Sequence, residues 1–262
     1  MNIVVTVKQV TDPNLPSTHI VIDENTKKIV SPYGMPPVMN GYDANALETA
    51  LKLRDTHGGR ITVICLGDNN SRATLKRAQA MGANDVVLLD DPLWSELDSA
   101  GLGQVLAAAI RKIELTDLVL CGRQASDTDG GQVLFWIAQA LDLPVVCPVA
   151  EIEASTDTDL IVHRLMEEGY QRVQVSLPAL LGMSSESNPP RAPTMKGTML
   201  ANKSRAPSWK AVDLVMPELK KKVELQKLDI QIRTARAKII EGSNAKAKGA
   251  ALADILCEAG VL

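Results

Sequence analysis

Twelve residues near the middle of the chain, 122–133, have the composition of an anion-binding loop. They read Gly-Arg-Gln-Ala-Ser-Asp-Thr-Asp-Gly-Gly-Gln-Val, follow the strand-like run 117–121 and lead directly into the apolar run 133–138. When a strand passes through such a loop into a helix, free backbone N–H groups remain at the helix start, and the helix dipole favours negative charge there. We therefore expect this loop to hold a phosphate, with Arg123 able to pair with it bidentately.

Other interpretations of the same loop stay open. It has neither the Gly-Lys-Ser/Thr ending of one phosphate-binding motif nor the Gly-x-Gly-x-x-Gly spacing of the dinucleotide motif. It could be an ordinary turn in which Asp127 or Asp129 caps the next helix. Arg123 could then form a solvated ion pair with Asp127 instead of contacting a ligand.

A second polar segment, residues 40–43, ends a proline-rich stretch and begins the first long run with helical spacing. Asn40 or Asp43 could cap that helix, since both residue types are favoured at a helix start. Alternatively, Asn40 and Tyr42 lie over the mouth of the sheet, near the end of the first strand. The segment is therefore either a structural cap or a second part of the site.

The remaining reactive side chains form no catalytic pattern. The acidic pairs at 90–91 and 167–168 are expected to be solvated turn residues, and no Ser/His/Asp or Cys/His arrangement can be recognised. The four cysteines stand alone and the three histidines are scattered, so we predict no catalytic residue, disulfide framework, iron–sulfur cluster or other metal site. A nucleotide pocket without catalytic residues is typical of a cofactor carrier.

The elements that would position the loop alternate between strands and helices. The expected strands are residues 3–7, 61–66, 85–89, 117–121 and 145–147, and the expected helices are 43–57, 71–81, 99–113 and 132–141. Continuous apolar strands separated by helices predict a doubly wound, Rossmann-like α/β fold with a mainly parallel sheet. Its ligands should bind beyond the carboxyl ends of the strands, where segments 8–10, 67–70 and 122–131 lie.

The pattern changes after residue 148. Residues 149–154, 159–165 and 170–177 alternate and predict antiparallel strands added to one edge of the sheet, and 178–182 is a last apolar strand. From residue 183 onward no compact core is evident: 184–193 is expected to be a loop, 212–240 extended and 246–258 helical. A long tail without its own core is hard to stabilise alone, so we expect it to pack on another subunit.

Charge is distributed unevenly along the chain. Residues 1–190 carry 14 basic and 24 acidic side chains, whereas residues 191–248 carry 14 basic and 5 acidic ones. Such a split can indicate nucleic-acid binding, but the basic segment lacks interleaved aromatic residues and known motifs, so we expect an acidic protein surface and no nucleic acid as its partner. No apolar run approaches the roughly 18–20 residues of a membrane span, and the first residues are not typical of a secretory signal, so we expect a cytoplasmic protein.

With these segments identified, the sequence resembles the beta (small) subunit of electron transfer flavoproteins nearly from end to end. The segments that carry the resemblance are Val5-Thr-Val-Lys-Gln-Val10, Asn40-x-Tyr-Asp-x-x-Ala-Leu-Glu-Thr-Ala-Leu51, Ala80-Met-Gly-Ala-Asn-Asp85, Leu120-Cys-Gly-Arg-Gln-Ala-x-Asp127 with Gln132-Val133, Pro178-Ala, Asn188-x-Pro-Arg-x-x-Thr-Met195 and Arg236-x-Lys-Ile-Ile-Glu-Gly242. Their common order and spacing make the resemblance specific.

The resemblance implies a heterodimer with an alpha subunit that carries a redox FAD, and an adenine nucleotide on this chain. That nucleotide is AMP in the housekeeping branch and a second FAD in the electron-bifurcating branch. Carried over position by position, the pocket consists of Thr6, Asn40, Gly41, Tyr42, Asp43, Leu66, Gly122, Arg123, Gln124, Ala125, Ser126, Asp127, Thr128, Asp129, Gly130, Gly131, Gln132 and Val133. The phosphate would meet the backbone amides of residues 129–133.

The resemblance also implies how the chain is divided. Residues 1–182 would be the nucleotide-binding domain, 183–203 a partner-recognition loop and 204–262 an arm that packs on the alpha subunit. Within the loop, Asn188, Arg191 and Met195 would contact the partner, with Met195 as a flexible apolar anchor.

The choice of branch depends on a few residues. Tyr42-Asp43 and Gly122-Arg-Gln-Ala125 are similar to the bifurcating branch, whereas Ser126 and the Gly130-Gly131 pair depart from it. We expect FAD on this chain, hydride exchange with NADH, and an acyl-CoA dehydrogenase or iron–sulfur oxidoreductase as partner. The alternatives are a non-bifurcating carrier with structural AMP, or a nucleotide-binding regulator similar to universal stress proteins, which would leave residues 183–262 unexplained.

Overall fold

A computed structural model describes the chain as two compact units, residues 1–228 and 229–262. The described residues are 1–24, 26–30, 32, 34–113, 115–219, 221–230 and 237–261. We describe each unit by itself.

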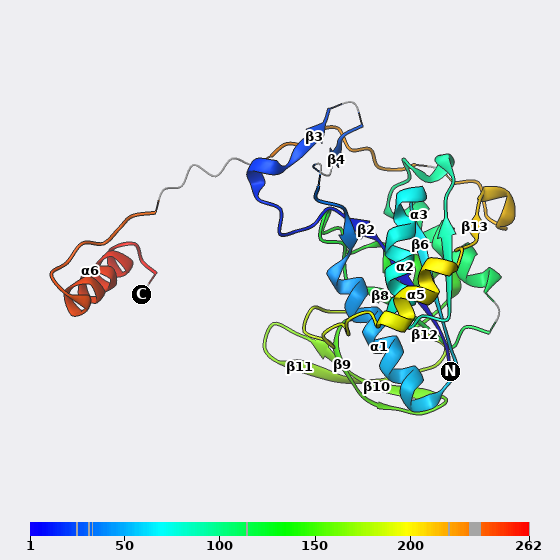
Figure 1. Ribbon diagram of the computed structural model, residues 1–262. Helices are drawn as coiled ribbons and strands as arrows, with labels where there is room; N and C mark the ends of the chain where they lie inside the picture. The colour runs from blue at the N-terminus through cyan, green and yellow to red at the C-terminus, as the bar shows by residue number, and fades with distance from the viewer. Residues whose placement is uncertain are drawn as a thin grey trace. The chain divides into compact units, whose positions relative to one another are not determined.

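The first unit is built on a nine-stranded, mainly parallel sheet, which confirms the predicted Rossmann-like α/β class (Figure 1). The strand order is β11-β10-β9-β12-β8-β1-β6-β7-β13. The bounds of these strands are Asn2–Val7 (β1), Arg60–Leu66 (β6), Asp85–Leu89 (β7), Leu118–Gly122 (β8), Val145–Ser155 (β9), Asp159–Leu165 (β10), Tyr170–Ser176 (β11), Ala179–Met183 (β12) and Ser208–Trp209 (β13). Strand β1 pairs in parallel with both β6 and β8.

Helices cover both faces of this sheet. Helices α1 (Gly41–His57) and α2 (Arg72–Met81) cover one face, and α3 (Ser99–Lys112) and α4 (Val133–Leu141) cover the other. Along β1, Ile3 and Val5 belong to the core under α1 and α2, whereas Val4 belongs to the core under α3 and α4. Successive strand residues point to opposite faces, so a strand buried on both sides needs an unbroken apolar run.

The antiparallel extension is present at the predicted edge. Strands β9, β10 and β11 pair in antiparallel fashion, and β12 lies between β8 and β9, parallel to both. The expected strands 145–147 and 149–154 form one continuous strand, β9, which passes through Pro148 with a cis Cys147–Pro148 bond. Proline lacks an N–H group, which is why the sequence pattern indicated an interruption there.

Several short elements were not predicted from the sequence. They are β2 (Gln9–Val10), β3 (Val21–Asp23), β4 (Lys28–Val30), β5 (Val38–Met39), η1 (Ser17–His19), η2 (Asn69–Ser71), η3 (Pro92–Trp94), α5 (Met195–Lys203) and η4 (Ala211–Asp213). Strands β3 and β4 form a separate hairpin, and β2 pairs with β5. Short elements of two or three residues are too brief to show a period in the sequence.

The expectation that no core exists past residue 183 is wrong for part of this segment. Strand β13 pairs with β7 and forms the edge of the sheet, and Leu214 is buried in the core under α3 and α4. Lys112 lies over the Trp209 ring, 4.5 Å from its centre, and the carboxylate of Asp98 accepts hydrogen bonds from the N–H of Lys222, at 2.8 Å, and of Val223. Residues 204–219 and 221–223 therefore pack, in part, on the chain's own domain.

Among its described residues, the second unit contains one helix, α6 (Ala245–Glu258), close to the predicted range 246–258. The side chain of Asn244 caps it by accepting a hydrogen bond from the N–H of Ala247 at 2.9 Å. None of the described residues of α6 is buried. Arg236, which opens the resembling segment 236–242, lies outside the described residues, and packing of this unit on another subunit stays a prediction.

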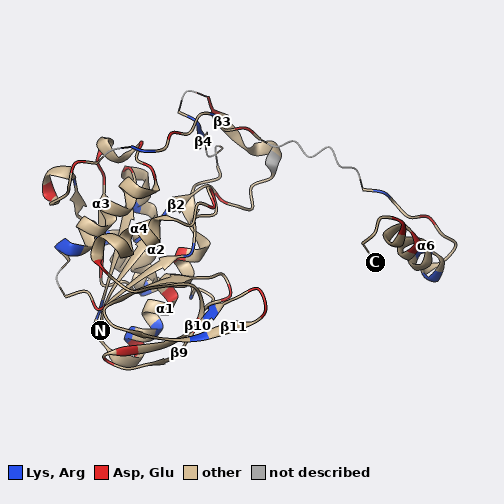
Figure 2. Ribbon diagram, turned by 180° about the vertical axis from the view of Figure 1, so that it is seen from behind, with Lys and Arg blue, Asp and Glu red and all other residues tan. Residues whose placement is uncertain are grey.

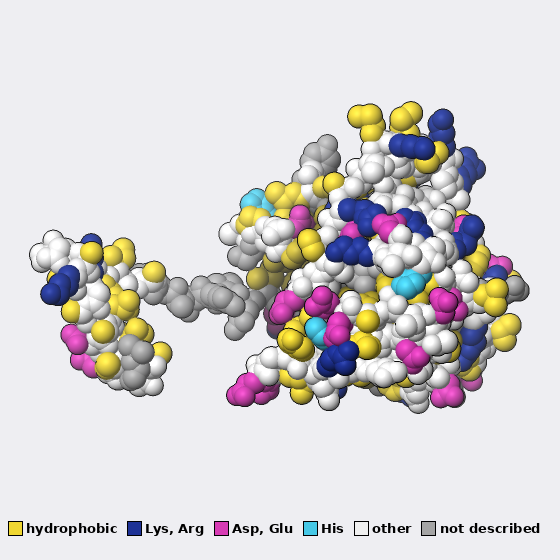
Figure 3. Space-filling view, turned by 90° about the horizontal axis from the view of Figure 1, so that it is seen from below, with side chains coloured by type: hydrophobic (Ala, Val, Ile, Leu, Met, Phe, Trp, Pro, Cys, Tyr) yellow, Lys and Arg dark blue, Asp and Glu magenta, His cyan; other side chains and the backbone are white. Residues whose placement is uncertain are grey.

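Charged side chains lie on helices, loops and edge strands, whereas the central strands are nearly uncharged (Figure 2). On the face shown in Figure 3, acidic, basic and apolar side chains are interspersed. Cys65 and Cys121 are buried, Cys147 is half-buried and Cys257 is exposed. Over the described ranges, no helix has the length and apolar character that crossing a bilayer requires.

Candidate functional site

The loop between β8 and α4, residues 123–132, lies at the carboxyl edge of the sheet beside the end of β1. From β1 the chain continues to β6 and β7 on one side, and β8 lies on the other side of β1. The strand order therefore reverses between β1 and β8. Open parallel sheets bind their ligands at such a reversal.

The end of β8 packs tightly against the start of α1. A Cβ atom on Gly122 would lie 2.7 Å from the Cβ of Tyr42 and closer still to the carboxylate of Asp43. Real Cβ atoms do not approach other atoms this closely, so only glycine fits here. Gly122 thus allows the close approach of these two elements.

Asp43 is a buried brace between two strand ends. Its carboxylate accepts hydrogen bonds from the N–H of Lys8 at 2.7 Å and from the N–H of Gly122 at 3.2 Å. Burial raises the pKa of Asp43 from 3.8 to about 7, although these two N–H groups oppose the shift. Because both oxygens are engaged inside the fold, Asp43 shapes the site from beneath.

Asn40 holds the β8–α4 loop. It occupies the position before α1, but its side chain makes no capping hydrogen bond there, so the capping interpretation is wrong for Asn40. Its amide instead donates to the carbonyl oxygen of Gln124 at 2.8 Å and accepts from the N–H of Ser126 at 3.2 Å. Asn40 is 1% exposed, so this pair of bonds is shielded from water.

The acidic side chains of the loop have partners of their own. Both carboxylate oxygens of Asp127 lie 2.7 Å from the ammonium nitrogen of Lys8, and Asp129 accepts from the side-chain amide of Gln124 at 2.7 Å. Neither Asp127 nor Asp129 caps α4, and the ion pair between Asp127 and Arg123 is not formed. Lys8 was missed as a site residue, although its place directly after the first strand was a signal.

Arg123 has a different neighbour from the one expected. Its guanidinium carbon lies 5.4 Å from the centre of the Tyr42 ring, in a cation–π contact. Its Nε also donates to the side-chain oxygen of Gln124 at 3.2 Å. Tyr42 and Arg123 therefore form one wall beside the loop.

The start of α4 is open. The residue before the helix is Gln132, and no side chain among those described caps it. Asp129 and Gly131 have left-handed φ angles of 48° and 58°. Backbone turns of this kind can gather successive N–H groups into an anion-binding concavity. A Cβ on Gly130 would meet no described atom within 4 Å, so there is space over this part of the loop.

These residues fit a phosphate-bearing group. The hydroxyl of Ser126 is buried and has no hydrogen-bond partner in the described part of the chain. Buried polar atoms are usually paired, so an unpaired one in the loop that leads to an uncapped helix start fits a ligand-binding loop. The nearby carboxylates are already engaged by Lys8 and by the Gln124 amide, which reduces their repulsion of an anion.

The structure brings most of the predicted pocket together. Around the ends of β1 and β8 lie Asn40, Gly41, Tyr42, Asp43, Gly122, Arg123, Gln124, Ala125, Ser126, Asp127, Thr128, Asp129, Gly130, Gly131, Gln132 and Val133. Thr6 lies in β1, where its hydroxyl contacts the thiol of Cys121, whose pKa burial raises to about 12. Leu66 ends β6, on the far side of β1, and packs at the margin of the core under α3.

The predicted partner-contact residues divide into two groups. Asn188 donates to the hydroxyl of Thr49 at 3.2 Å and accepts from Lys52, and Arg191 pairs with Glu48 at 2.9 Å. Both therefore hold their loop against α1. Met195 is 84% exposed at the start of α5, so its side chain is free to contact another protein.

Helix α5 lies on α2. The N–H of Thr194 donates to the carbonyl oxygen of Ala80 at 3.3 Å, and a Cβ on Gly197 would overlap that same oxygen. Within α5, Ala201 is buried, whereas Met199 and Leu200 are largely exposed. The helix thus has one seated side and one apolar outer side.

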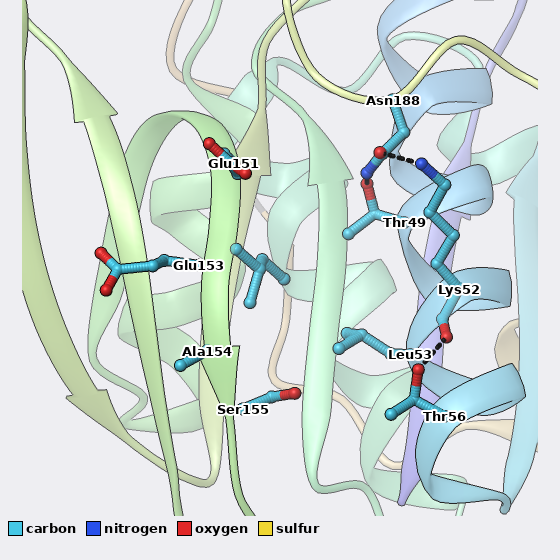
Figure 4. A pocket seen from close by; sticks show the side chains of 10 residues that line it. Thr49, Lys52, Leu53, Thr56, Glu151, Glu153, Ala154, Ser155 and Asn188 are labelled. Carbon is cyan, nitrogen blue, oxygen red and sulfur yellow. Dashed lines mark hydrogen bonds between the residues drawn. The ribbon is translucent and has the colours of Figure 1, made fainter.

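A hollow of about 360 Å³ lies away from this loop, between α1 and β9 (Figure 4). Its lining residues are Thr49, Lys52, Leu53, Thr56, Glu151, Ile152, Glu153, Ala154, Ser155 and Asn188. The β8–α4 loop is the better candidate for a phosphate site, because the hollow contains no helix start and no glycine-rich loop that could hold a phosphate. No group of three or more potential metal-ligating side chains occurs within the ranges that the structure describes.

Fold and site together define a Rossmann-like α/β protein with a glycine-rich loop at its strand-order reversal. Residues 33–214 match the family model described as "Electron transfer flavoprotein domain", and the chain belongs to the electron transfer flavoprotein family, among its beta subunits.

Three relatives illustrate this membership. The chain is 37% identical to electron transfer flavoprotein subunit beta of Thermoanaerobacterium thermosaccharolyticum, over 93% of this chain and 88% of that protein. It is 39% identical to caffeyl-CoA reductase-Etf complex subunit CarD of Acetobacterium woodii, over 82% and 80% of the two chains. It is also 35% identical to acryloyl-CoA reductase electron transfer subunit gamma of Anaerotignum propionicum, over 76% and 73%.

Proposed function

We propose that this chain is the beta half of a heterodimeric electron carrier and that its β8–α4 loop binds an adenine nucleotide. The observation that carries this proposal is the uncapped start of α4, which follows a loop with the unpaired hydroxyl of Ser126. Backbone N–H groups at a helix start favour a phosphate without needing a charged side chain. The nucleotide's phosphate would be held by the amides of residues 129–133.

We propose FAD as this nucleotide. The space over Gly130 supports a ligand larger than a phosphate alone. Two relatives are named as subunits of caffeyl-CoA reductase and acryloyl-CoA reductase systems, which supports an acyl-CoA dehydrogenase as the electron-transfer partner. NADH is the electron donor that goes with the proposed second FAD. An iron–sulfur oxidoreductase remains the alternative partner, and AMP the alternative nucleotide.

The chain's own residues would bind and orient the nucleotide, and none of them is proposed to be catalytic. Asn40 and Asp43 fix the loop from beneath, and Lys8 holds Asp127 away from the phosphate. Ser126 offers its hydroxyl as a hydrogen-bond donor. A bound FAD would supply the hydride and single-electron chemistry.

An alpha subunit is the proposed constant partner. Helix α6 has no buried residue among those described, and Val212 and Val215 are about nine-tenths exposed, at 87% and 95%. Apolar side chains left in water in this number favour burial against another protein. The alpha subunit would carry the second redox FAD.

Counting nucleotides in the co-purified heterodimer tests the proposal. We expect two FAD per dimer, measured by flavin absorbance and by separation of the released nucleotides. One FAD and one AMP would refute FAD on this chain while retaining nucleotide binding. One FAD and no second adenine nucleotide, even after incubation with excess FAD or AMP, would refute the site itself.

A further inference from the structure

Helix α1 contacts two segments that are distant in sequence. Its start holds the β8–α4 loop, because Asn40 and Asp43 bond to Gln124, Ser126 and Gly122. Its middle holds the segment 184–191, which leads into α5. Helix α1 therefore contacts both the proposed nucleotide site and the segment that leads into α5.

The contacts to residues 184–191 come from one side of α1. Asn45 donates to the carbonyl oxygen of Ser185 at 3.2 Å, Thr49 and Lys52 contact Asn188, and Glu48 and Asp55 contact Arg191 (Figure 4 shows Thr49, Lys52 and Asn188). Each of these α1 positions lies three or four residues from at least one other, so together they occupy one face of the helix.

We call these contacts between α1 and residues 184–191 the seat, and Glu48 lies at its centre. Its carboxylate is buried, at 3% exposure, and accepts hydrogen bonds from the backbone N–H of Arg191 at 3.0 Å and from its guanidinium at 2.9 to 3.1 Å. A buried carboxylate without a partner is strongly unfavourable. The seating of Arg191 therefore supplies the partner that the buried Glu48 carboxylate needs.

We propose that α1 couples the nucleotide loop to this seat. A nucleotide in the β8–α4 loop would fix the start of α1 through Asn40 and Asp43, and α1 would then stabilise residues 185–194 through Glu48. Since those residues lead into α5, nucleotide occupancy would set the order of the surface that carries Met195 and Met199. This inference rests on the proposed nucleotide binding.

The coupling is reciprocal, because two binding events that stabilise one arrangement must favour each other equally. An electron-transfer partner bound to α5 would therefore tighten nucleotide binding by the same factor. In this scheme Glu48 is a positioning residue: it touches neither nucleotide nor partner.

Hydrogen exchange on the heterodimer tests this coupling. The complex is stripped of nucleotide and then reloaded with FAD or with AMP as separate probes. Amides of residues 122–133 report binding, and amides of 185–194 report the seat. We expect loading to slow exchange in both segments, on the order of fivefold in residues 185–194, at the low end of typical coupling.

Two variants separate the α1 route from direct contact between the segments. Glu48→Gln keeps the size of the side chain and removes its charge, and we expect it to abolish the response of residues 185–194 while 122–133 remain protected. Asp55→Asn is the matched control, since it removes only the outer, half-exposed partner of Arg191 and should keep the response. If Glu48→Gln does not fold, Asn188→Ala, which removes the contacts to Thr49 and Lys52, replaces it with the same expectation.

The outcomes distinguish the inference from the proposed function. If 122–133 become protected and 185–194 do not, the coupling is refuted and the nucleotide site stands. A full response retained in Glu48→Gln refutes the route through Glu48. If neither probe protects 122–133, nucleotide binding is refuted and the coupling with it.

Discussion

The carboxylate of Asp43 and the backbone N–H of Gly122 are joined at 3.2 Å across the end of the sheet. The same carboxylate accepts from the N–H of Lys8, so one side chain at the start of α1 ties together the ends of β1 and β8. These two strands flank the reversal of strand order. The proposed nucleotide site therefore has a buried carboxyl group beneath it, and its properties can be tested through that group.

The first prediction concerns Gly122. Gly122→Ala adds a Cβ that must lie 2.7 Å from the Cβ of Tyr42. We expect a loss of about 1–3 kcal/mol in the free energy of unfolding, as for other overpacked sites, together with weaker nucleotide binding. Urea unfolding measures it. Gly130→Ala is the control for stability, because its Cβ meets no described atom within 4 Å; equal losses of unfolding free energy in the two variants would show that the close approach does not matter.

A pH dependence follows from Asp43. Burial raises its pKa to about 7, so in the folded state it keeps its proton over a range where the unfolded chain, at its ordinary value of 3.8, has lost it. Its contribution therefore lowers stability as pH rises from about 4 to about 7, by up to about 1.4 kcal/mol per pH unit, and is constant above that. Comparing urea unfolding of the wild type and Asp43→Asn at pH 5, 6, 7 and 8 checks this. The same dependence of unfolding free energy on pH in both proteins would contradict this prediction.

Ser126 gives a prediction with opposite effects on stability and binding. Its hydroxyl is buried and unpaired in the described structure, so Ser126→Ala should leave the nucleotide-free protein as stable as before or slightly more stable. Nucleotide binding should weaken about three- to tenfold, which corresponds to one lost hydrogen bond of about 1 kcal/mol. Titration calorimetry with FAD and AMP measures the second effect. Unchanged affinity for both would show that the hydroxyl does not contact the ligand.

Gly197 tests the seating of α5 on α2. Gly197→Ala places a Cβ against the carbonyl oxygen of Ala80, so α5 must move away from α2. We expect slower electron transfer to the partner at low partner concentration, with the rate at saturation nearly preserved, because the docking surface is displaced and the redox groups are not. Lys196→Ala, one residue away on the same helix and at an exposed position, is the control. Identical kinetics of Gly197→Ala and wild type would refute a role for this contact.

Much of the fold could be predicted because its central elements have a strong local pattern. Strands such as 3–7 and 118–122 are unbroken apolar runs, since both of their faces are buried. Helix α1 shows apolar residues at helical spacing. In contrast, α5 has a single buried residue, and β13 is two residues long, so neither leaves a period that the sequence can show.

The position of the loop could also be predicted, but not the contacts within it. Asp127 pairs with Lys8, 119 residues earlier, and Asn40 bonds to residues 84 and 86 positions later. From the local sequence, Asn40 and Asp127 could each cap the nearest helix. In the structure both side chains bond to distant segments instead. Such pairings depend on which strands become neighbours, which a single sequence does not state.

The burial of the thiols has a practical consequence for spectroscopy. Cys65 and Cys121 are buried with pKa values raised to about 12, which keeps them as unreactive thiols at neutral pH, whereas Cys257 is exposed on α6. After Cys147→Ser, a maleimide spin label or fluorophore should attach at Cys257 alone. The second unit thus carries a natural attachment point from which its proposed docking on an alpha subunit can be followed in real time.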